Sequence, residues 1–419
     1  MRRNFAVSDT NVFKQKVLNW LKQFSTFCFL DSSQYQNGYD LIVGAGVSES
    51  FNSSTPDALD NFQLFINKKA RWLFGHLGYE LATSEKISHS YKNDQLFFPD
   101  LFFFEPEILL TLKHGEVIIE ATDTEEIFNN IQQTVPPESK YEQQFQQIES
   151  KISRNEYLSI LNQLKQHLQR GDCYEINFCQ EFFVKNVLAD PFSLFNKLCE
   201  KSPNPFSGLY RIDDKWLLCA SPERFIKKEK DQIISQPIKG TLQRHQNNDP
   251  EKERVALLQS EKDRAENVMV VDLVRNDLSR ICEEGSVKVD ELFGIYSFPQ
   301  VHQMISTVSG RLKREVKFKD IINATFPMGS MTGAPKVKVM QLIDQYEKSK
   351  RGIFSGALGY INADGDFDFN VVIRSMMYNQ STQYLSFQAG GGITIYSDAE
   401  KEWEESLLKA KAIKEILES

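Results

Sequence analysis

Lys239 and Glu223 are an amine and a carboxyl group that the sequence places at the ends of neighbouring predicted strands. The β-branched residues 231–235 predict the strand before Lys239, and Gly240 and Thr241 let the chain leave it sharply. A lysine attacks as a nucleophile only when it is neutral, and with an ordinary pKa of about 10.4 roughly one in a few thousand is neutral at pH 7. Burial beside a cation would lower that pKa, and most strand-end lysines lack such surroundings.

Two acidic pairs form a second group of candidate residues. Asp263 and Glu266 share a face of one predicted helix, and Glu402 and Glu405 share a face of another. If both faces point inward, the carboxylates could hold Mg²⁺, which proteins often bind through one or two carboxylates together with water and substrate oxygens. The alternative is two solvated helix faces, because Asp and Glu side chains are mostly exposed.

A third group has the features of a site for a small carboxylate or phosphate. Residues 329–336 form a small-residue loop before a predicted helix start, whose free N–H groups would attract an anion. Arg374 can bind a carboxylate through two parallel hydrogen bonds. The glycines at 390–392 interrupt the last predicted strand, which indicates either close approach of a ligand or a bulge. The loop does not match the phosphate-binding pattern GxxxxGK[ST], so nucleotide binding is poorly supported.

Helices are predicted where the acidic pairs must be held. A capping box beginning at Ser153 predicts a helix over residues 153–169. The Asp-Pro pair at 249–250 predicts the start of one long charged helix that carries the first acidic pair and runs toward Arg280. A second capping box, beginning at Ser397, opens the final helix, which carries the second pair.

Strands and a possible division of the chain follow from the remaining patterns. Residues 174–182 alternate apolar and polar side chains, which predicts a strand whose polar face meets water or lines a cavity. Further strands are predicted over residues 352–361, 367–378 and 384–395. A proline- and glutamine-rich stretch at 136–147 separates an N-terminal region, 1–135, from a second region, 150–419. We expect both to be intertwined in one body.

Composition excludes several classes of protein. With 419 residues, 41% of them hydrophobic and 25% charged, the chain is typical of a globular protein. A net charge of -8 and the lack of a basic stripe argue against nucleic acid as a partner. The six cysteines form no CxxC pair, and neither they nor the six histidines have metal-ligand spacing, so we expect reduced thiols in a cytoplasmic protein. No signal peptide and no membrane-spanning run of about 18 apolar residues is recognised, so no membrane partner is expected.

Many short motifs of the second region resemble those of one family. In chain order they are Ser221-Pro222-Glu223-Arg224-Phe225, Pro237-Ile238-Lys239-Gly240-Thr241, Asp263-Arg264-Ala265-Glu266-Asn267, Val271-Asp272-Leu273-Val274-Arg275-Asn276-Asp277, Gly333-Ala334-Pro335-Lys336, Phe354-Ser355-Gly356-Ala357-Leu358-Gly359-Tyr360, Ile373-Arg374, Ala389-Gly390-Gly391-Gly392-Ile393 and Glu402-Trp403-Glu404-Glu405. Over roughly residues 150–419 the chain resembles the chorismate-utilising enzymes, which include the large components of anthranilate and aminodeoxychorismate synthases and the isochorismate and salicylate synthases. The resemblance implies an α+β fold with two large antiparallel sheets packed with helices.

The resemblance also implies roles for the candidate residues. Glu266 and Glu405 would be the main Mg²⁺ ligands, assisted by Asp263 and Glu402, and Glu223 would be the general acid for the 4-hydroxyl of chorismate. The residues implied to hold the carboxylates of chorismate are Gly240, Thr241, Thr332, Gly333, Tyr360, Arg374, Gly390, Gly391, Gly392 and Lys409.

Lys239 distinguishes among the members of the family. At this point anthranilate synthases carry a sequence like Pro-Ile-Ala-Gly-Thr. Aminodeoxychorismate synthases carry Pro-Ile-Lys-Gly-Thr, which residues 237–241 of this chain resemble. The implied mechanism has the Lys239 amine add at C2 while Glu223 protonates the departing hydroxyl. Ammonia then enters at C4 and expels the lysine, giving 4-amino-4-deoxychorismate, a precursor of p-aminobenzoate and folate.

At two positions the residue of this chain differs from the residue of related enzymes. Isochorismate and salicylate synthases use a water-activating lysine at the position matching Glu175, which is acidic here, so water addition is disfavoured. A histidine of the family is replaced by Gln303, with His302 one place earlier, and the role of His302 stays open.

The resemblance implies a partner that supplies ammonia. The chain shows no amidotransferase nucleophile motif, so a separate glutamine amidotransferase subunit is implied. Two alternatives remain open: anthranilate synthase component I, and a non-catalytic chorismate-binding subunit. Leu30-Asp31-Ser32 has only slight similarity to the tryptophan-binding segment of feedback-regulated relatives, and tryptophan regulation is not expected.

Overall fold

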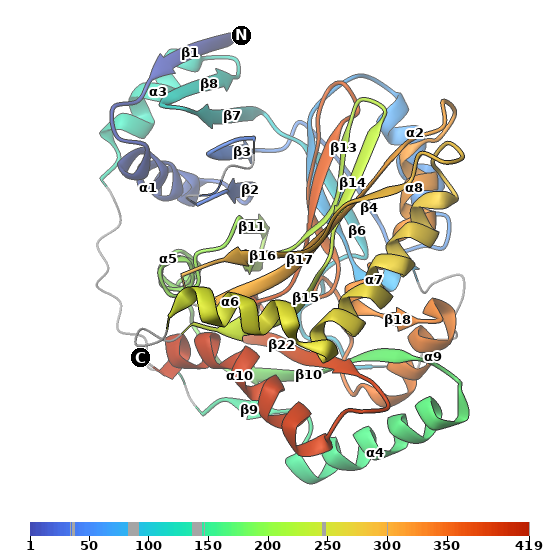
Figure 1. Cartoon of the computed structure of the whole chain (residues 1–419). Coiled ribbons are helices and arrows are strands. Elements are labelled where there is room, and N and C mark those ends of the chain that lie inside the picture. Colours follow the sequence, from blue (N-terminus) through green and yellow to red (C-terminus); the bar gives the residue numbers. More distant parts are fainter. Residues whose placement is uncertain are drawn as a thin grey trace.

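Two antiparallel sheets dominate the structure, a computed structural model that describes residues 1–33, 35, 38–82, 92–135, 145, 147–244, 249–299 and 301–418. Most of the stretch predicted to divide the chain, 136–147, lies outside the described residues. Both sheets nevertheless take strands from each side of that stretch, so the two regions share one pair of sheets (Figure 1).

The larger sheet has 12 strands in the described part of the chain. In spatial order they are β1 (Arg2–Ala6), β8 (Glu116–Glu120), β7 (Ile108–Lys113), β3 (Leu41–Ala45), β2 (Thr26–Asp31), β11 (Phe206–Ile212), β12 (Lys215–Ser221), β21 (Ser375–Asn379), β22 (Tyr384–Ile393), β10 (Glu175–Val184) and β18 (Gly333–Ala334), with β9 (Glu149–Ser150) also paired to β10. Every residue of β10 is buried, so its polar face lines the interior rather than meeting water.

The second sheet has 10 strands within the same described residues. Their order is β15 (Ile238–Gln243), β17 (Val301–Arg311), β14 (Gln232–Gln236), β13 (Arg224–Glu229), β20 (Phe367–Val371), β19 (Ala357–Ile361), β5 (Leu73–Leu77), β6 (Leu101–Glu105) and β4 (Glu49–Ser53), with β16 (Lys288–Ser297) paired to β17. One apolar core contains side chains from both sheets, such as Tyr210 and Met377 of the first with Phe74 and Leu358 of the second.

Helices cover the outer faces and supply two functional surfaces. They are α1 (Thr10–Trp20), α2 (Ala58–Asn67), α3 (Thr124–Gln133), α4 (Arg154–Arg170), α5 (Pro191–Lys201), α6 (Pro250–Gln259), α7 (Glu261–Ser279), α8 (Phe318–Thr325), α9 (Lys336–Tyr346) and α10 (Ala399–Glu418), with short 3-10 turns η1 (Leu21–Gln23), η2 (Tyr79–Ala82) and η3 (Gly329–Met331). Helix α7 lies against β15 and β17, and α10 lies against β22 (Figure 1). Within the described residues, no helix combines the length and apolar character that a bilayer crossing requires.

Helix starts follow the predicted caps with two differences. Ser153 caps α4, and Asp249 caps α6 with Pro250 in the first turn, as predicted. The predicted long helix to Arg280 is wrong: it is two helices, because the Ser260 side chain accepts a hydrogen bond from the Asp263 N–H and starts α7 afresh. The last helix is capped by Asp398, which accepts from Lys401, and not by Ser397.

The last predicted strands also need correction. The predicted strand over 367–378 is two strands in different sheets, β20 and β21, which are separated by a turn where Arg374 adopts a φ of 51°. The predicted strand over 352–361 begins only at Ala357. Strand β22 runs unbroken through residues 390–392, so the predicted interruption is absent.

Candidate active site

Lys239 projects from β15 and is almost completely buried. Next to it, Gly240 has a φ of 92° and passes so close to α7 that a Cβ there would lie 2.9 Å from the Asp263 Cβ. The Asn267 amide of α7 lies 3.5 Å from the Lys239 carbonyl and accepts a hydrogen bond from Ser306 Oγ at 2.6 Å. Helix and strand therefore fix the backbone that carries the lysine.

The Lys239 amine donates a hydrogen bond to Glu175 of β10, whose side chain is 2% exposed. Burial alone would lower the pKa of Lys239, but the carboxylates of Glu175, Glu266 and Glu223 together raise it above its ordinary value. The sequence-based expectation of a lowered pKa requires a cation beside the amine, whereas the nearest charges in this structure are those of carboxylates. The resting lysine is an ammonium held by Glu175.

Glycines at 390–392 make room for this pair. A Cβ at Gly392 would lie 2.5 Å from Glu175 Oε1 and 2.8 Å from Lys239 Nζ. A Cβ at Gly391 would lie 3.2 Å from Glu402 Oε2, and one at Gly390 only 1.9 Å from the Phe178 carbonyl oxygen. The lack of side chains at these glycines lets neighbouring groups lie close to the strand, and the strand is regular and has no bulge.

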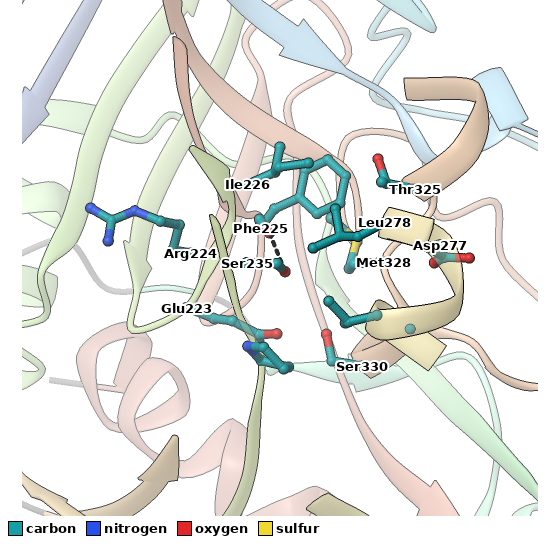
Figure 2. A pocket seen from close by; sticks show the side chains of 13 residues that line it. Glu223, Arg224, Phe225, Ile226, Ser235, Asp277, Leu278, Thr325, Met328 and Ser330 are labelled. Atoms are coloured by element: carbon teal, nitrogen blue, oxygen red, sulfur yellow. Dashed lines mark hydrogen bonds between the residues drawn. The ribbon is translucent and has the colours of Figure 1, made fainter. Parts of the chain in front are cut away.

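Glu223 lies just beyond β12 and is 4% exposed. Burial raises its pKa to about 7, against the opposing effects of the Ser330 hydroxyl and of the Lys239 and Arg374 cations. It borders a cavity of about 20 Å³, with Ser330 beside it and apolar side chains farther in, while Arg224 points away (Figure 2). A cavity of this size holds roughly one water molecule. A carboxyl group with this pKa can be protonated near neutral pH and donate its proton.

Helices α7 and α10 bring three of the predicted carboxylates together. Lys262 Nζ lies 3.8 Å from Glu266 Oε1, 3.7 Å from Glu402 Oε1 and 3.9 Å from Glu405 Oε2. Burial raises the pKa of Glu266 to about 7, whereas Lys409 lowers that of Glu405. Asp263 lies at the edge of this group, facing Gly240. The two acidic faces thus point inward, and solvated faces are excluded for Glu402 and Glu266.

The donor set suits Mg²⁺ by its chemistry. Glu266 Oε1 is buried and has no hydrogen-bond partner among the described residues, and Glu402 is held by a 2.8 Å hydrogen bond from Ser397 Oγ. Oxygen-only carboxylate ligands with open positions are what Mg²⁺ prefers. In the described part of the chain no three acidic, histidine or cysteine side chains are already close enough to hold a metal ion, and the Lys262 ammonium lies among the three glutamates.

One further cation lies beside this cluster and another beside Glu223. Lys409 donates to the Gly390 carbonyl oxygen at 2.9 Å and pairs with Glu405 at 2.8 Å. Arg374 faces Glu223, and burial lowers its pKa. Among the described residues the Arg374 guanidinium has no hydrogen-bond acceptor, so it remains available to an anion.

The loop before α9 is fixed to β10. Thr332 accepts a hydrogen bond through its carbonyl oxygen from Asn177 N at 2.7 Å, and Gly333 pairs with Ile176. The Thr332 hydroxyl donates to the Met328 carbonyl oxygen at 3.0 Å, so it is already engaged. Lys336 is also engaged, with Asp277. Thr241, in contrast, is an exposed residue within β15.

The buried Arg351 explains why this loop and β10 stay together. It donates to the Met331 carbonyl oxygen at 2.7 Å and to the Asn177 carbonyl oxygen at 2.9 Å, and it pairs with Glu347 at 2.6 Å. Glu347 in turn accepts from Cys179 N at 2.8 Å. The pair therefore joins the end of α9, the loop and the strand that carries Glu175.

Tyr360 is not brought to these side chains. It lies on β19, where its ring packs against Tyr39, Trp72 and Phe74 and lines a separate cavity of about 60 Å³. Strand alternation points it toward the N-terminal strands. The prediction that Tyr360 binds substrate therefore disagrees with its position.

His302 also lies apart from Lys239. Its ring contacts Ser297 Oγ at 2.9 Å and Glu253 of α6 at 3.4 Å. The neighbouring Gln303 is buried and pairs in register with Thr241. His302 thus belongs to the packing of α6 on β17.

Sequence reasoning placed Glu175 at the position of a water-activating lysine of related enzymes but gave it no role here, and it missed Lys262. A second signal for Glu175 was its place on a strand with a polar face, which proved to be buried. The signal for Lys262 was its place one residue before Asp263, on the helix that carries the acidic pair.

The chain is similar to known proteins over most of its length. Residues 27–415 match the family described as chorismate binding enzyme. The chain is 41% identical over 271 residues to aminodeoxychorismate synthase component 1 of Klebsiella aerogenes, which covers 64% of this chain and 59% of that protein. It is 34% identical over 363 residues to the anthranilate synthase component I-like protein of Synechocystis sp., covering 83% of this chain and 72% of that protein.

A solved structure extends the likeness to nearly the whole chain. The crystal structure of anthranilate synthase component I from Streptococcus pneumoniae TIGR4 matches with a TM-score of 0.74 and 26% identity, over 98% of this chain and 92% of that chain. The expected α+β fold with two large antiparallel sheets is confirmed.

Proposed function

Because the chain belongs to the chorismate binding enzyme family, we propose that it converts chorismate and ammonia to 4-amino-4-deoxychorismate. The single observation that carries the proposal is the buried Lys239 amine, which lies in a motif of aminodeoxychorismate synthase type and is hydrogen-bonded to Glu175. The K. aerogenes relative, of which the chain covers 59%, supports this choice by its name.

Lys239 and Glu223 divide the chemistry between a nucleophile and an acid. The Lys239 amine attacks C2 of the ring, the double bond shifts, and the bond between C4 and its oxygen breaks. Glu223, protonated near neutral pH, gives its proton to the departing oxygen so that water leaves. Ammonia then bonds to C4, the electron pair of the carbon–nitrogen bond returns to Lys239, and the new ammonium group returns a proton to Glu223.

Substrate anions would be held by the groups around this pair. The free guanidinium of Arg374 suits one carboxylate. Glu266 and Glu405, with Glu402 and Asp263 beside them, would hold Mg²⁺. When bound, this ion supplies a positive charge for a substrate carboxylate.

A partner subunit is proposed as the source of ammonia. The name component 1 of the relatives implies a second component, and we propose a glutamine amidotransferase. Ammonium salt should replace this partner in a test with the isolated chain.

Anthranilate synthase component I is the second candidate. It is favoured by the names of the Synechocystis relative and of the S. pneumoniae structure. That reaction releases pyruvate and gives a fluorescent product, so the two candidates are readily separated. A non-catalytic chorismate-binding subunit is disfavoured because Glu223, Glu266 and Glu405 are all present.

The test is a product assay with chorismate, MgCl₂ and ammonium salt, read by mass spectrometry. Aminodeoxychorismate is expected from the wild-type protein and not from Lys239→Ala. Lys227→Ala is the matched control, because this lysine pairs with Glu229 on β13 and should leave product formation unchanged. Formation of anthranilate or isochorismate alone, or full activity of Lys239→Ala, would reject the proposal.

A further inference from the structure

The hydrogen bond between Glu175 and Lys239 is enclosed by β10, β15 and β22. Glu175 is 2% exposed and Lys239 9% exposed, and Gly392 leaves no more space than the pair needs. Among the described residues, Glu175 is the one side chain that accepts a hydrogen bond from the Lys239 amine. A proton leaving this amine inside a closed site therefore has one acceptor already in contact.

The charges around Lys239 keep its proton in place before substrate arrives. Glu175 faces it from β10, Glu266 from α7, Glu405 from α10 and Glu223 from the turn after β12. Cys179, also on β10, is a further titratable neighbour whose own pKa is raised by burial. These anions raise the pKa of Lys239, so at neutral pH its ammonium group does not simply lose its proton to solvent.

We propose that Glu175 is a further catalytic residue, which takes the proton of the Lys239 ammonium when substrate fills the site and later returns it. This inference rests on the proposed function, because it requires Lys239 to act as the nucleophile. Glu175 Oε2 is buried and accepts no hydrogen bond from the described residues. A carboxylate anion with so few donors is poorly stabilised, and so is an ion pair from which water has been removed. Transfer of one proton along the existing hydrogen bond turns the pair into a neutral amine and a neutral acid.

The proposed cycle balances protons and electrons. An N–H bond of Lys239 breaks and an O–H bond forms on Glu175, after which the amine attacks C2 and becomes a secondary ammonium. When ammonia bonds to C4, the C2–N bond breaks and its electron pair returns to Lys239, which leaves as a neutral amine. Glu175 then gives its proton back to Lys239, while Glu223 serves the departing hydroxyl independently.

Glu175→Gln tests the role, because the amide keeps the size of the side chain and cannot take up the proton. Turnover is measured from about pH 7 to about pH 9.5 with free ammonia held constant. The wild-type rate should fall above pH 7 as Glu223 loses its proton, so the quantity compared is the ratio of the variant rate to the wild-type rate at each pH. This ratio should be about 10⁻² to 10⁻⁴ at pH 7 and should recover about tenfold per pH unit, because Lys239 of the variant must lose its proton to solvent before the site closes.

Two further variants separate proton transfer from positioning. Glu175→Asp keeps a carboxylate and should retain the wild-type pH profile at a lower rate. Glu181→Gln removes another buried carboxylate from the same strand, one bonded to Ser349 and Tyr384, and should keep the wild-type profile. Thermal unfolding of each variant checks that it folds.

The possible failures are distinguishable. If the wild-type protein makes no aminodeoxychorismate, both the proposed function and this inference are overturned. If the wild-type protein makes it but Glu175→Gln has the same rate at pH 7, or is slowed by one factor at every pH, the inference alone is overturned.

Discussion

Alanine at Gly392 should separate Lys239 from Glu175 while leaving β22 folded. The added Cβ would lie 2.5 Å from Glu175 Oε1 and 2.8 Å from Lys239 Nζ, against the 3.4 Å at which ordinary van der Waals contact begins. The carboxylate must therefore move by about 0.9 Å, the difference between 3.4 Å and 2.5 Å. Both obstructing atoms are ends of side chains, so the strand itself need not shift, and we expect a loss of stability below about 1.5 kcal/mol.

The cost should appear in catalysis. Displacement of a reacting group by about 1 Å can lower a rate by about 10²-fold, so Gly392→Ala should lose turnover by roughly that factor. Gly391→Ala is a milder neighbour, because its Cβ would lie 3.2 Å from Glu402 Oε2 and 3.5 Å from Glu405 Oε1. Its effect should fall on Mg²⁺ affinity.

Gly390→Ala is the structural contrast in the same strand. Its Cβ would lie 1.9 Å from the Phe178 carbonyl oxygen, so β22 and β10 would have to separate, at a cost of about 3 kcal/mol or more. Urea unfolding and product formation are measured for all three variants. Normal turnover of Gly392→Ala, or a Gly390→Ala protein as stable as wild type, would refute the close packing deduced for this strand.

Three further predictions concern charges in and near the site. Burial raises the pKa of Glu223 from 4.5 to about 7, so ionisation of this carboxyl group destabilises the fold as pH rises through this interval. Glu223→Gln should therefore be more stable than wild type at pH 8 by up to about 3 kcal/mol and equally stable below about pH 4. Urea unfolding that gives equal stabilities at both pH values would contradict this. Arg351→Met should lower the free energy of unfolding by about 3–5 kcal/mol because it leaves the Glu347 carboxylate buried without its cation, and Glu347→Gln in the same chain should restore part of the loss, which urea unfolding of the single and double variants measures. Mg²⁺ and chorismate should each tighten binding of the other in the turnover-deficient Lys239→Ala protein, since a dianion enters a cluster of carboxylates more readily with a divalent cation; calorimetric titrations that show independent binding would contradict it.

Local features could be predicted from the sequence because neighbouring residues determine them. Ser153 and Asp249 cap helices as expected, since each side chain satisfies an N–H group a few residues along its own chain. The strand before Lys239 was also predictable from its β-branched residues. The motifs around Glu223 and Lys239 indicated the family, which the match over residues 27–415 confirms.

Features that depend on distant segments could not be predicted in this way. The turn at Arg374 has a φ of 51°, uncommon for arginine, and it arises because β20 and β21 pair in different sheets. Tyr360 obeys the alternation of its strand, but alternation does not say which of two cavities a face will line. The break at Ser260 was readable from the three-residue spacing between Ser260 and Asp263, yet continuous helical composition concealed it.

The charges of the site explain why one lysine can be both stable and reactive. A lone buried ammonium would be costly, and so would the carboxylates of Glu175 and Glu266 without cations. Lys239 and Lys262 each lie beside these anions, so the resting site is balanced by its own side chains, and this balance raises the pKa of both lysines. A second cation bound to Glu266 would neutralise one of the anions that hold the proton on Lys239. The charges of the acidic cluster and of Lys239 are therefore coupled, because a cation bound at the cluster weakens the attraction that holds the proton on Lys239.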